Sequence, residues 1–238
     1  MQRLSGLDAA FVYLETATNH MHVGLVGVFD PSIAPGGYSF AKVRARVESR
    51  LSLVPPFRRR LLEVPFRLPH PVWIEDPAFD LDYHLRRRAL PAPGGDGELA
   101  EFAAEVFGRG LDRRRPLWEM DVVEGLQDGM FAVVTKIHHA AIDGVSGGEV
   151  VARLLDLQAE PVDLPAAEET WRPEAIPTDL ELLAEAGLDL LARIGPALQA
   201  VRRAVEGVEQ RRIDRPDEPA RLLPAGLRWL RRPISTRR

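Results

Sequence analysis

The sequence predicts a mixed α/β (α+β) fold in which a mixed sheet is flanked by helices. Two patterns indicate this: valine-rich apolar segments of strand length, and segments in which apolar residues recur at helical spacing. The chain has 238 residues, of which 45% are hydrophobic and 28% are charged. That composition is typical of a globular protein with enough apolar material for a substantial core.

Helices are expected in three segments of the first half of the chain. Residues 5–14 have Ser5 or Asp8 near their start, where a side-chain oxygen can cap a helix. Residues 40–53 carry apolar side chains at helical spacing, and a proline pair directly afterwards ends that helix. A third helix is expected over residues 98–107.

Strands are expected between and after these helices. Residues 21–29 are rich in valine and are followed by an Asp-Pro pair, and residues 71–75 are a short candidate strand. Residues 118–123 and 130–139 are two further apolar segments, separated by a short glycine-bounded stretch. Their spacing predicts a hairpin or two neighbouring strands.

The predicted domain organisation has three parts. Residues 1–157 form a compact body, and residues 158–178, rich in proline and acidic side chains, form an exposed linker. Residues 179–238 form an amphipathic helical arm with a basic end. Such helices usually cover a core, and the alternative for this arm is contact with a membrane or lipid-droplet surface.

Composition and charge exclude several classes of function. The formal net charge is −4, so no global positive field favours nucleic acid as a partner. The chain has no cysteine, which excludes disulfides, thiolate zinc sites and a cysteine nucleophile. The N-terminal residues do not resemble a signal peptide, and no apolar run approaches the roughly 18 residues of a membrane span. We therefore expect a cytoplasmic protein.

The most informative stretch of the sequence is the segment 131–150. Because side chains alternate along a strand, His139 is expected on one face and His138 on the other. Asp143 and Gly144 fall in the turn that follows. A capping-box pattern that begins at Ser146 then predicts the start of a helix.

Several functions are compatible with this segment. A histidine at a strand end can act as a general base, because its ordinary pKa near 6.5 leaves much of it neutral at pH 7, with Asp143 orienting the ring or holding the turn. The G-x-S-x-G match around Ser146 predicts a hydrolase, but the hydrolase order requires a histidine after the serine, and none follows His139. A metal site would use His138, His139 and Asp143 with His20 or His22, yet adjacent strand histidines diverge. Two ordinary hydrogen-bonded histidines explain the pattern equally well.

The segment also resembles a known family. His138, His139, Asp143 and Gly144 match the HHxxxDG motif of the acyl-CoA-dependent acyltransferase superfamily. Further blocks narrow the resemblance to bacterial wax ester synthase/diacylglycerol acyltransferases, strongly over about residues 4–157. These blocks are Leu4–Phe11, Asn19–Gly24, Phe79–Arg86 and Pro116–Glu119, the last of which carries the PLW motif.

The resemblance implies a function and roles for the motif residues. The fold would be one half of a chloramphenicol acetyltransferase-like fold, and the activity would be transfer of a long-chain acyl group from acyl-CoA to diacylglycerol or a long-chain alcohol. His139 would be the general base, His138 and Asp143 would be supporting residues, and Gly144 would permit the turn. Acyl-CoA would be a co-substrate, with no resident cofactor and no metal. The PLW residues Pro116, Leu117 and Trp118 are expected to pack in the core rather than bind substrate.

One departure from the family pattern concerns whether the chain can catalyse the reaction by itself. Members of the family have two similar domains with the reaction tunnel between them, and this sequence corresponds to the first domain and the connection after it. We therefore expect the chain to need a complementing C-terminal half for activity. The alternatives are a catalytically inactive half-domain that binds lipid or a partner, and another HHxxxDG reaction such as condensation.

Overall fold

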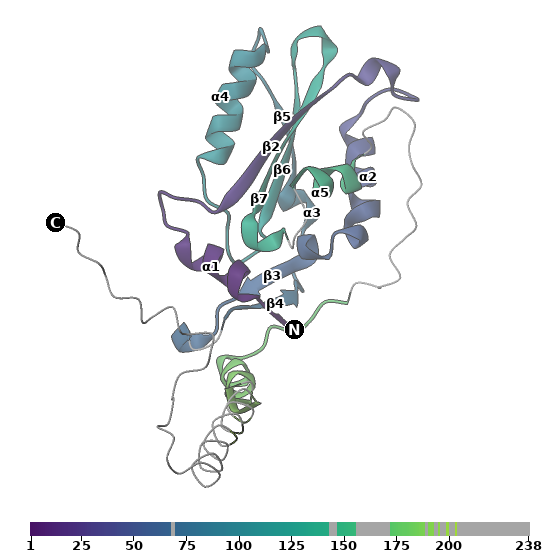
Figure 1. Cartoon of the computed structure of the whole chain (residues 1–238). Helices are drawn as coiled ribbons and strands as arrows, with labels where there is room; N and C mark the ends of the chain where they lie inside the picture. The colour runs from purple at the N-terminus through teal and green to yellow at the C-terminus, as the bar shows by residue number, and fades with distance from the viewer. Residues whose placement is uncertain are drawn as a thin grey trace, which may run out of the picture. The chain divides into compact units, whose positions relative to one another are not determined.

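The computed structural model describes residues 1–67, 70–142, 147–155 and 172–188, and isolated positions between 190 and 203 (Figure 1). The chain divides into two compact units, residues 1–183 and residues 184–238. All the contacts reported below lie within the first unit. Most of the predicted linker and arm lies outside the described residues, so the three-part organisation stays a prediction.

The centre of the first unit is a four-stranded mixed sheet with the order β2-β7-β6-β5. β7 pairs antiparallel with both of its neighbours, while β5 runs parallel to β6, so the predicted mixed sheet is confirmed. A second, antiparallel sheet has the order β1-β4-β3. The strands of the first sheet are β2 (His22–Phe29), β5 (Leu85–Ala89), β6 (Trp118–Glu124) and β7 (Phe131–His138), and those of the second are β1 (Gln2–Arg3), β3 (Arg59–Leu62) and β4 (Val72–Glu75).

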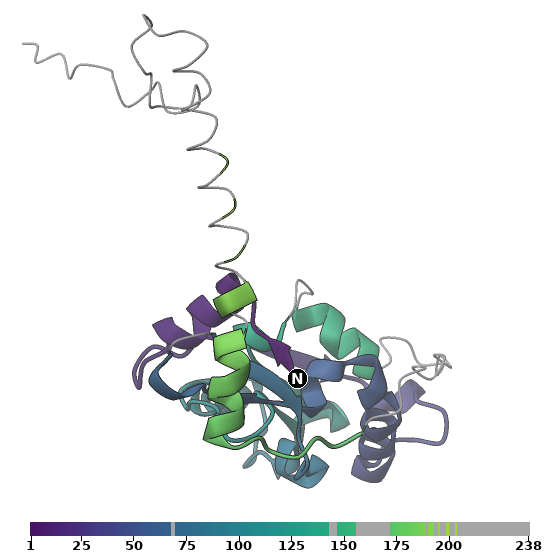
Figure 2. The same cartoon turned by 90° about the horizontal axis from the view of Figure 1, so that it is seen from below.

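Helices cover both faces of the larger sheet, as Figure 1 and Figure 2 show. Helix α4 (Asp96–Phe107) buries Leu99, Ala103 and Val106 against one face of the sheet. Helices α2 (Phe40–Arg50) and α5 (Gly147–Leu154) contact each other and pack in the main core on the other face. Two further α-helices are α1 (Gly6–Leu14) and the single turn α3 (Leu81–His84), and residues 179–188 are helical as well.

The side chains of β7 alternate between the two faces as predicted. Val133 and Ile137 belong to the core beneath α2 and α5, whereas Ala132 and Val134 belong to the core beneath α4. Because both faces are covered, every residue of the strand after Phe131 is buried, including the polar residues Thr135, Lys136 and His138. This packing holds β7, which carries the histidine pair at its end.

The predicted helices 5–14, 40–53 and 98–107 correspond to α1, to α2 with a following 3₁₀ turn, and to α4. The predicted strands correspond to β2, β4, β6 and β7, and β6 and β7 are antiparallel neighbours. The sequence did not predict β5, because its run of three arginines lacks an apolar pattern. The structure explains this run by ion pairs with acidic residues of β6: Arg86 with Glu119 at 3.1 Å, Arg87 with Glu124 at 2.8 Å and Arg88 with Asp121 at 3.2 Å.

The PLW residues lie at the start of β6 and are all buried. The Trp118 indole stacks between Phe57 and His84, with centroid distances of 4.3 and 4.7 Å, and its N–H donates to the Phe57 carbonyl at 2.9 Å. The side chain has no exposed surface. These contacts place Trp118 in the core that supports the end of β7.

Candidate active site

The histidine pair lies where β7 ends. β7 stops at His138, and His139 begins a 3₁₀ turn, His139–Ala141, so the strand ends one residue earlier than the predicted 130–139. The reason is local: the Nδ1 atom of His138 accepts the N–H of Ala140 at 3.0 Å and caps the turn. The expected divergence of the two rings holds, because His138 is 1% exposed and His139 is exposed.

The turn is fixed to both neighbouring strands. The backbone N–H of His138 donates to the Leu117 carbonyl at 3.0 Å, and that of His139 donates to the Met21 carbonyl at 2.8 Å. The residue before β6 and the residue before β2 therefore both hold the histidine backbone. The position of His139 is thus set by hydrogen bonds on either side of β7.

The side chain of His139 packs on helix α1. Its ring stacks on the ring of Phe11, with a centroid distance of 4.7 Å and an interplanar angle of 16°. The helix is capped at its start by Ser5, whose hydroxyl accepts the N–H of Asp8 at 3.2 Å. One face of the imidazole is therefore covered by an aromatic ring while the residue stays exposed to solvent.

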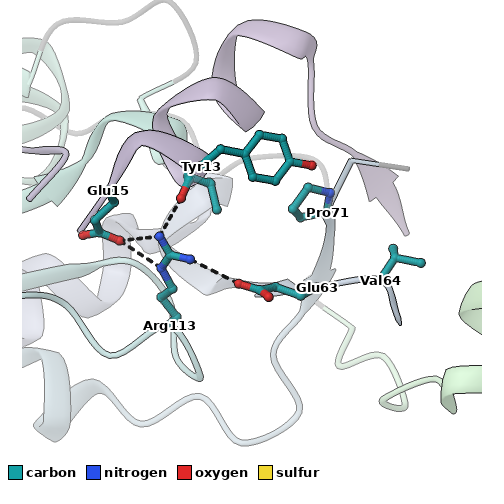
Figure 3. Close-up of a pocket in the computed structure, with 7 residues that line it drawn as sticks. Tyr13, Glu15, Glu63, Val64, Pro71 and Arg113 are labelled. Atoms are coloured by element: carbon teal, nitrogen blue, oxygen red, sulfur yellow. Dashed lines mark hydrogen bonds and ion pairs between the residues drawn. The ribbon is translucent and has the colours of Figure 1, made fainter. Parts of the chain in front are cut away.

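The buried ring of His138 lies beside a charged cluster. Its Nε2 atom is 3.7 Å from the carboxylate of Glu15, which follows α1. Arg113 donates to that carboxylate at 2.9 and 2.7 Å, and also donates to the Val12 carbonyl at 2.6 Å and to Glu63 at 3.1 Å. Arg113 lies between the two carboxylates, as Figure 3 shows.

Burial lowers the pKa of His138 to about 4, and this is the largest influence on the ring. Glu15 acts in the opposite direction and raises the pKa, while Arg113, His139 and His22 lower it. His138 is therefore neutral at pH 7. A neutral ring that accepts at Nδ1 carries its proton on Nε2, so the N–H group is on the side of the ring that faces Glu15.

A small pocket of about 80 Å³ adjoins the charged cluster. His139 does not line it, so this pocket does not reach the candidate base. Its lining residues are Val12, Tyr13, Glu15, Glu63, Val64, Pro71 and Arg113.

The other histidines proposed as metal ligands, at the start of β2, pack against the C-terminal end of α4. His20 and His22 stack on each other at 5.4 Å and hydrogen-bond to the carbonyls of Gly108 and Phe107. Within the described residues, no group of three or more His, Asp or Glu side chains is arranged to hold a metal ion. Asp143 and Gly144, as well as Ser146, lie outside the described residues, so the roles expected for Asp143 and Gly144 stay predictions.

Sequence reasoning missed Phe11, Glu15 and Arg113 as neighbours of the histidine pair. The available signal was weak: Glu15 ends an apolar segment, and Arg113 belongs to a run of arginines in an arginine-rich chain. Nothing in the spacing of these residues indicates that they meet.

The catalytic-domain profile of the wax ester synthase/diacylglycerol acyltransferase family matches residues 4–235. The chain belongs to this family. The resemblance seen in the sequence blocks is therefore confirmed, and the match extends beyond residue 157 into the predicted arm.

Two curated relatives of this chain come from Mycobacterium tuberculosis (strain ATCC 25618 / H37Rv). The "Putative diacyglycerol O-acyltransferase Rv3087" is 42% identical over 205 residues, which are 85% of this chain and 43% of the relative. The "Probable diacyglycerol O-acyltransferase tgs3" is 42% identical over 206 residues, 87% of this chain and 74% of the relative. The chain thus spans less than half the length of the first relative.

Solved structures show the same fold. The "Wax ester synthase/diacylglycerol acyltransferase from Marinobacter aquaeolei VT8" matches with a TM-score of 0.55 and 38% identity, over 64% of this chain and 38% of that chain. The first condensation domain of the calcium-dependent antibiotic synthetase matches with a TM-score of 0.51 and 16% identity, over 64% and 36% of the two chains. The second likeness shows the fold alone. The expected chloramphenicol acetyltransferase-like fold is confirmed over part of these structures.

Where the structure describes the chain, no helix is both long enough and apolar enough to cross a membrane.

Proposed function

We propose that this chain carries the general base of an acyl-CoA-dependent O-acyltransferase, which transfers a long-chain acyl group to diacylglycerol or a long-chain alcohol. The products are triacylglycerol or wax ester. The observation that carries the proposal is the exposed ring of His139, placed at the end of β7 and stacked on Phe11. Membership of the wax ester synthase/diacylglycerol acyltransferase family supports the reaction class.

In the proposed reaction, His139 takes the proton of the acceptor hydroxyl as its oxygen attacks the thioester carbonyl of acyl-CoA. The new C–O bond forms, the C–S bond breaks, and the thiolate of CoA takes up the proton from the imidazolium. The ring must be neutral at the start of this step and accessible to the hydroxyl. The exposure of His139 meets the second condition. No acyl-enzyme intermediate is needed, which suits a chain without cysteine.

The proposal includes a second half of the active site. The chain spans 43% of the Rv3087 relative, and the family's reaction tunnel lies between two domains. We propose that a complementing C-terminal half completes the site, and that the enzyme works at a membrane or lipid-droplet surface, where its lipid substrates are found. His138, Asp143 and Gly144 support the turn that carries the base.

The test uses the purified full chain, with and without a separately produced C-terminal half of a relative. Radiolabelled palmitoyl-CoA is supplied with diacylglycerol, a long-chain alcohol or a long-chain amine. We expect labelled ester only with the second half present, no ester from the His139→Ala variant, and full activity from the control variant His70→Ala.

Three outcomes would contradict parts of the proposal. Turnover with the amine alone would indicate a condensation-type reaction. Equal CoA release by the wild-type chain and His139→Ala, with both still binding liposomes, would indicate a lipid-binding half without catalysis. Robust turnover by the chain alone would refute the need for a second half.

A further inference from the structure

Glu15 and Arg113 have no role in the proton transfer proposed above, yet they lie beside the histidine pair. Their ion pair is close, at 2.7 Å, and the Glu15 side chain is only 10% exposed. Removing a carboxylate from water in this way is costly unless its pairing and hydrogen bonding are good, although the Arg113 side chain is itself 34% exposed. The Glu15 carboxylate also lies 3.7 Å from Nε2 of His138, which has no hydrogen-bond partner among the described residues.

Helix α1 connects the charged pair to both histidines. The N–H of Glu15 donates to the Phe11 carbonyl at 3.2 Å, so the two residues are one helical turn apart and lie on the same side of the helix. Phe11 covers the ring of His139, and Glu15 faces the ring of His138. The same segment therefore contacts both members of the pair.

The state of His138 decides the shape of the turn. The N–H of Ala140 is satisfied by Nδ1 of His138, and this bond exists only while Nδ1 carries no proton. A carboxylate beside Nε2 favours the tautomer with its proton on Nε2, by attraction to the positive end of the N–H dipole. In a buried site such an interaction is screened less than in water.

We propose that Glu15, held in place by Arg113, is a positioning residue that keeps His138 in the Nε2–H tautomer and so holds the turn that presents His139. The effect on catalysis rests on the proposed function. The effect on structure does not, because it concerns only the rings of His138 and His139 and the backbone amide of Ala140. The proposed role differs from a purely structural role, in which Arg113 and Glu15 only fasten α1 to the neighbouring loop.

The charges around His138 allow a test based on the direction in which its pKa shifts. The groups that face it are Glu15 after α1, Arg113 before β6, His22 on β2 and the adjacent His139. Removing the negative charge by Glu15→Gln should lower the His138 pKa further. Removing the positive charge by Arg113→Gln should raise it. A role limited to fastening α1 predicts no such opposite shifts.

The matched control is a second arginine–glutamate pair, far from the histidines. Arg87 donates to the two carboxylate oxygens of Glu124 at 3.0 and 2.8 Å. Glu124→Gln therefore removes an equivalent charge and leaves His138 unaffected. A second control, Glu15→Asp, keeps the charge and should restore part of the wild-type behaviour.

The experiment is isotope-edited NMR of the imidazole rings across a pH titration of the full chain, with amide hydrogen exchange at Ala140. We expect opposite pKa shifts in the two charge variants, a mixed His138 tautomer in Glu15→Gln, and exchange at Ala140 faster on the order of 10-fold, with thermal unfolding near that of the Glu124→Gln control. The same His138 pKa and the same Ala140 exchange in Glu15→Gln and in Glu124→Gln would overturn the inference.

Activity of the chain with its complementing half supplies a separate readout. Glu15→Gln should reduce kcat by about 10- to 100-fold, the size of effect found for residues that orient metal-ligating histidines, with KM unchanged. If the wild-type protein shows no acyl transfer while the NMR results hold, the proposed function fails and the control of His138 by Glu15 stands. If wild-type transfer is normal and Glu15→Gln leaves kcat unchanged, the positioning role is refuted.

Discussion

The rings of Phe11 and His139 stack 4.7 Å apart, and this contact joins helix α1 to the turn after β7. The aromatic ring covers one face of the imidazole and limits its rotation. Aromatic pairs of this geometry contribute about 0.5–1.5 kcal/mol beyond the area that they bury. We therefore expect this contact to slow chemical modification of the His139 ring.

Phe11→Leu should free the His139 ring and expose its covered face. We expect His139 to be modified faster by diethyl pyrocarbonate, measured by mass spectrometry of the modified peptides, and acyl transfer to fall. The control is Phe29→Leu, which removes a comparable stack with Phe131 at 5.2 Å. An unchanged modification rate at His139 in Phe11→Leu would contradict the prediction.

The stability of the protein should fall as the pH is lowered from 6.5 to 4, because His84 is buried. Burial lowers the pKa of His84 to about 4, and its Nδ1 donates to the Trp118 carbonyl at 2.7 Å. The unfolded chain binds a proton near pH 6.5 while the folded chain does not, so the folded state loses stability as the pH falls through this window and no more from this residue below about 4.

The measurement is urea denaturation at a series of pH values between 4 and 7. His84→Phe, which keeps an aromatic ring, should be less stable at pH 7 because the Trp118 carbonyl loses its donor, but its stability should depend less on pH. An equal pH dependence in His84→Phe and in the wild type would assign the effect to other groups.

The buried Lys136 should be essential for stability, because it satisfies the end of helix α4. Its ammonium donates to the carbonyls of Val106 and Arg109 at 3.0 and 2.8 Å and lies 3.4 Å from Glu119. Burial lowers the pKa of Lys136, whereas the nearby Glu119 carboxylate raises the pKa of Lys136. Lys136→Met leaves a carboxylate and two carbonyls without this partner, so we expect a loss of roughly 3–5 kcal/mol in the free energy of unfolding.

Lys42 is a matched control for this change. It is exposed, and its ammonium also donates to two backbone carbonyls, those of Gly36 and Gly37. Lys42→Met should cost less than about 1 kcal/mol, since water can replace a donor at an exposed site. Similar losses for the two variants in denaturant titrations would refute the importance of burial at Lys136.

Two glycine substitutions should have opposite effects. A Cβ atom at Gly24 would lie 2.6 Å from the Phe107 ring, so Gly24→Ala must displace that ring and should cost about 1–3 kcal/mol. A Cβ atom at Gly97, inside α4, meets nothing within 4 Å. Gly97→Ala should stabilise the protein by up to about 1 kcal/mol. Thermal unfolding measures both, and a stabilising Gly24→Ala would show that the contact is not close.

The elements that sequence reasoning predicted correctly are those whose apolar pattern is local. β2, β6 and β7 are rich in apolar residues because at least one face of each strand is packed. In α4 the buried apolar residues recur at helical spacing along one side of the helix. β5 was missed because Arg86, Arg87 and Arg88 become compatible with a strand only when acidic residues of β6 lie beside them. That information comes from a different part of the chain.

The candidate site shows the same limit. The alternation of side chains along a strand predicted the divergence of His138 and His139, although the structure places His139 in the turn after β7. The pairing of Arg113 with Glu15 joins residues 98 positions apart, and no local pattern indicates it. The exact end of β7 also depended on a tertiary detail, the capping of the turn by the His138 side chain.

The register of β2 against β7 has a consequence for how the protein assembles. His22, near the start of the chain, pairs with His138, and Met21 holds the backbone of His139. Contacts between such distant segments require closure of a long loop, which slows folding. During synthesis, α1 and β2 leave the ribosome well before β7 and the turn that follows it, which they contact. The histidine turn is therefore completed late, after most of the first unit has been translated.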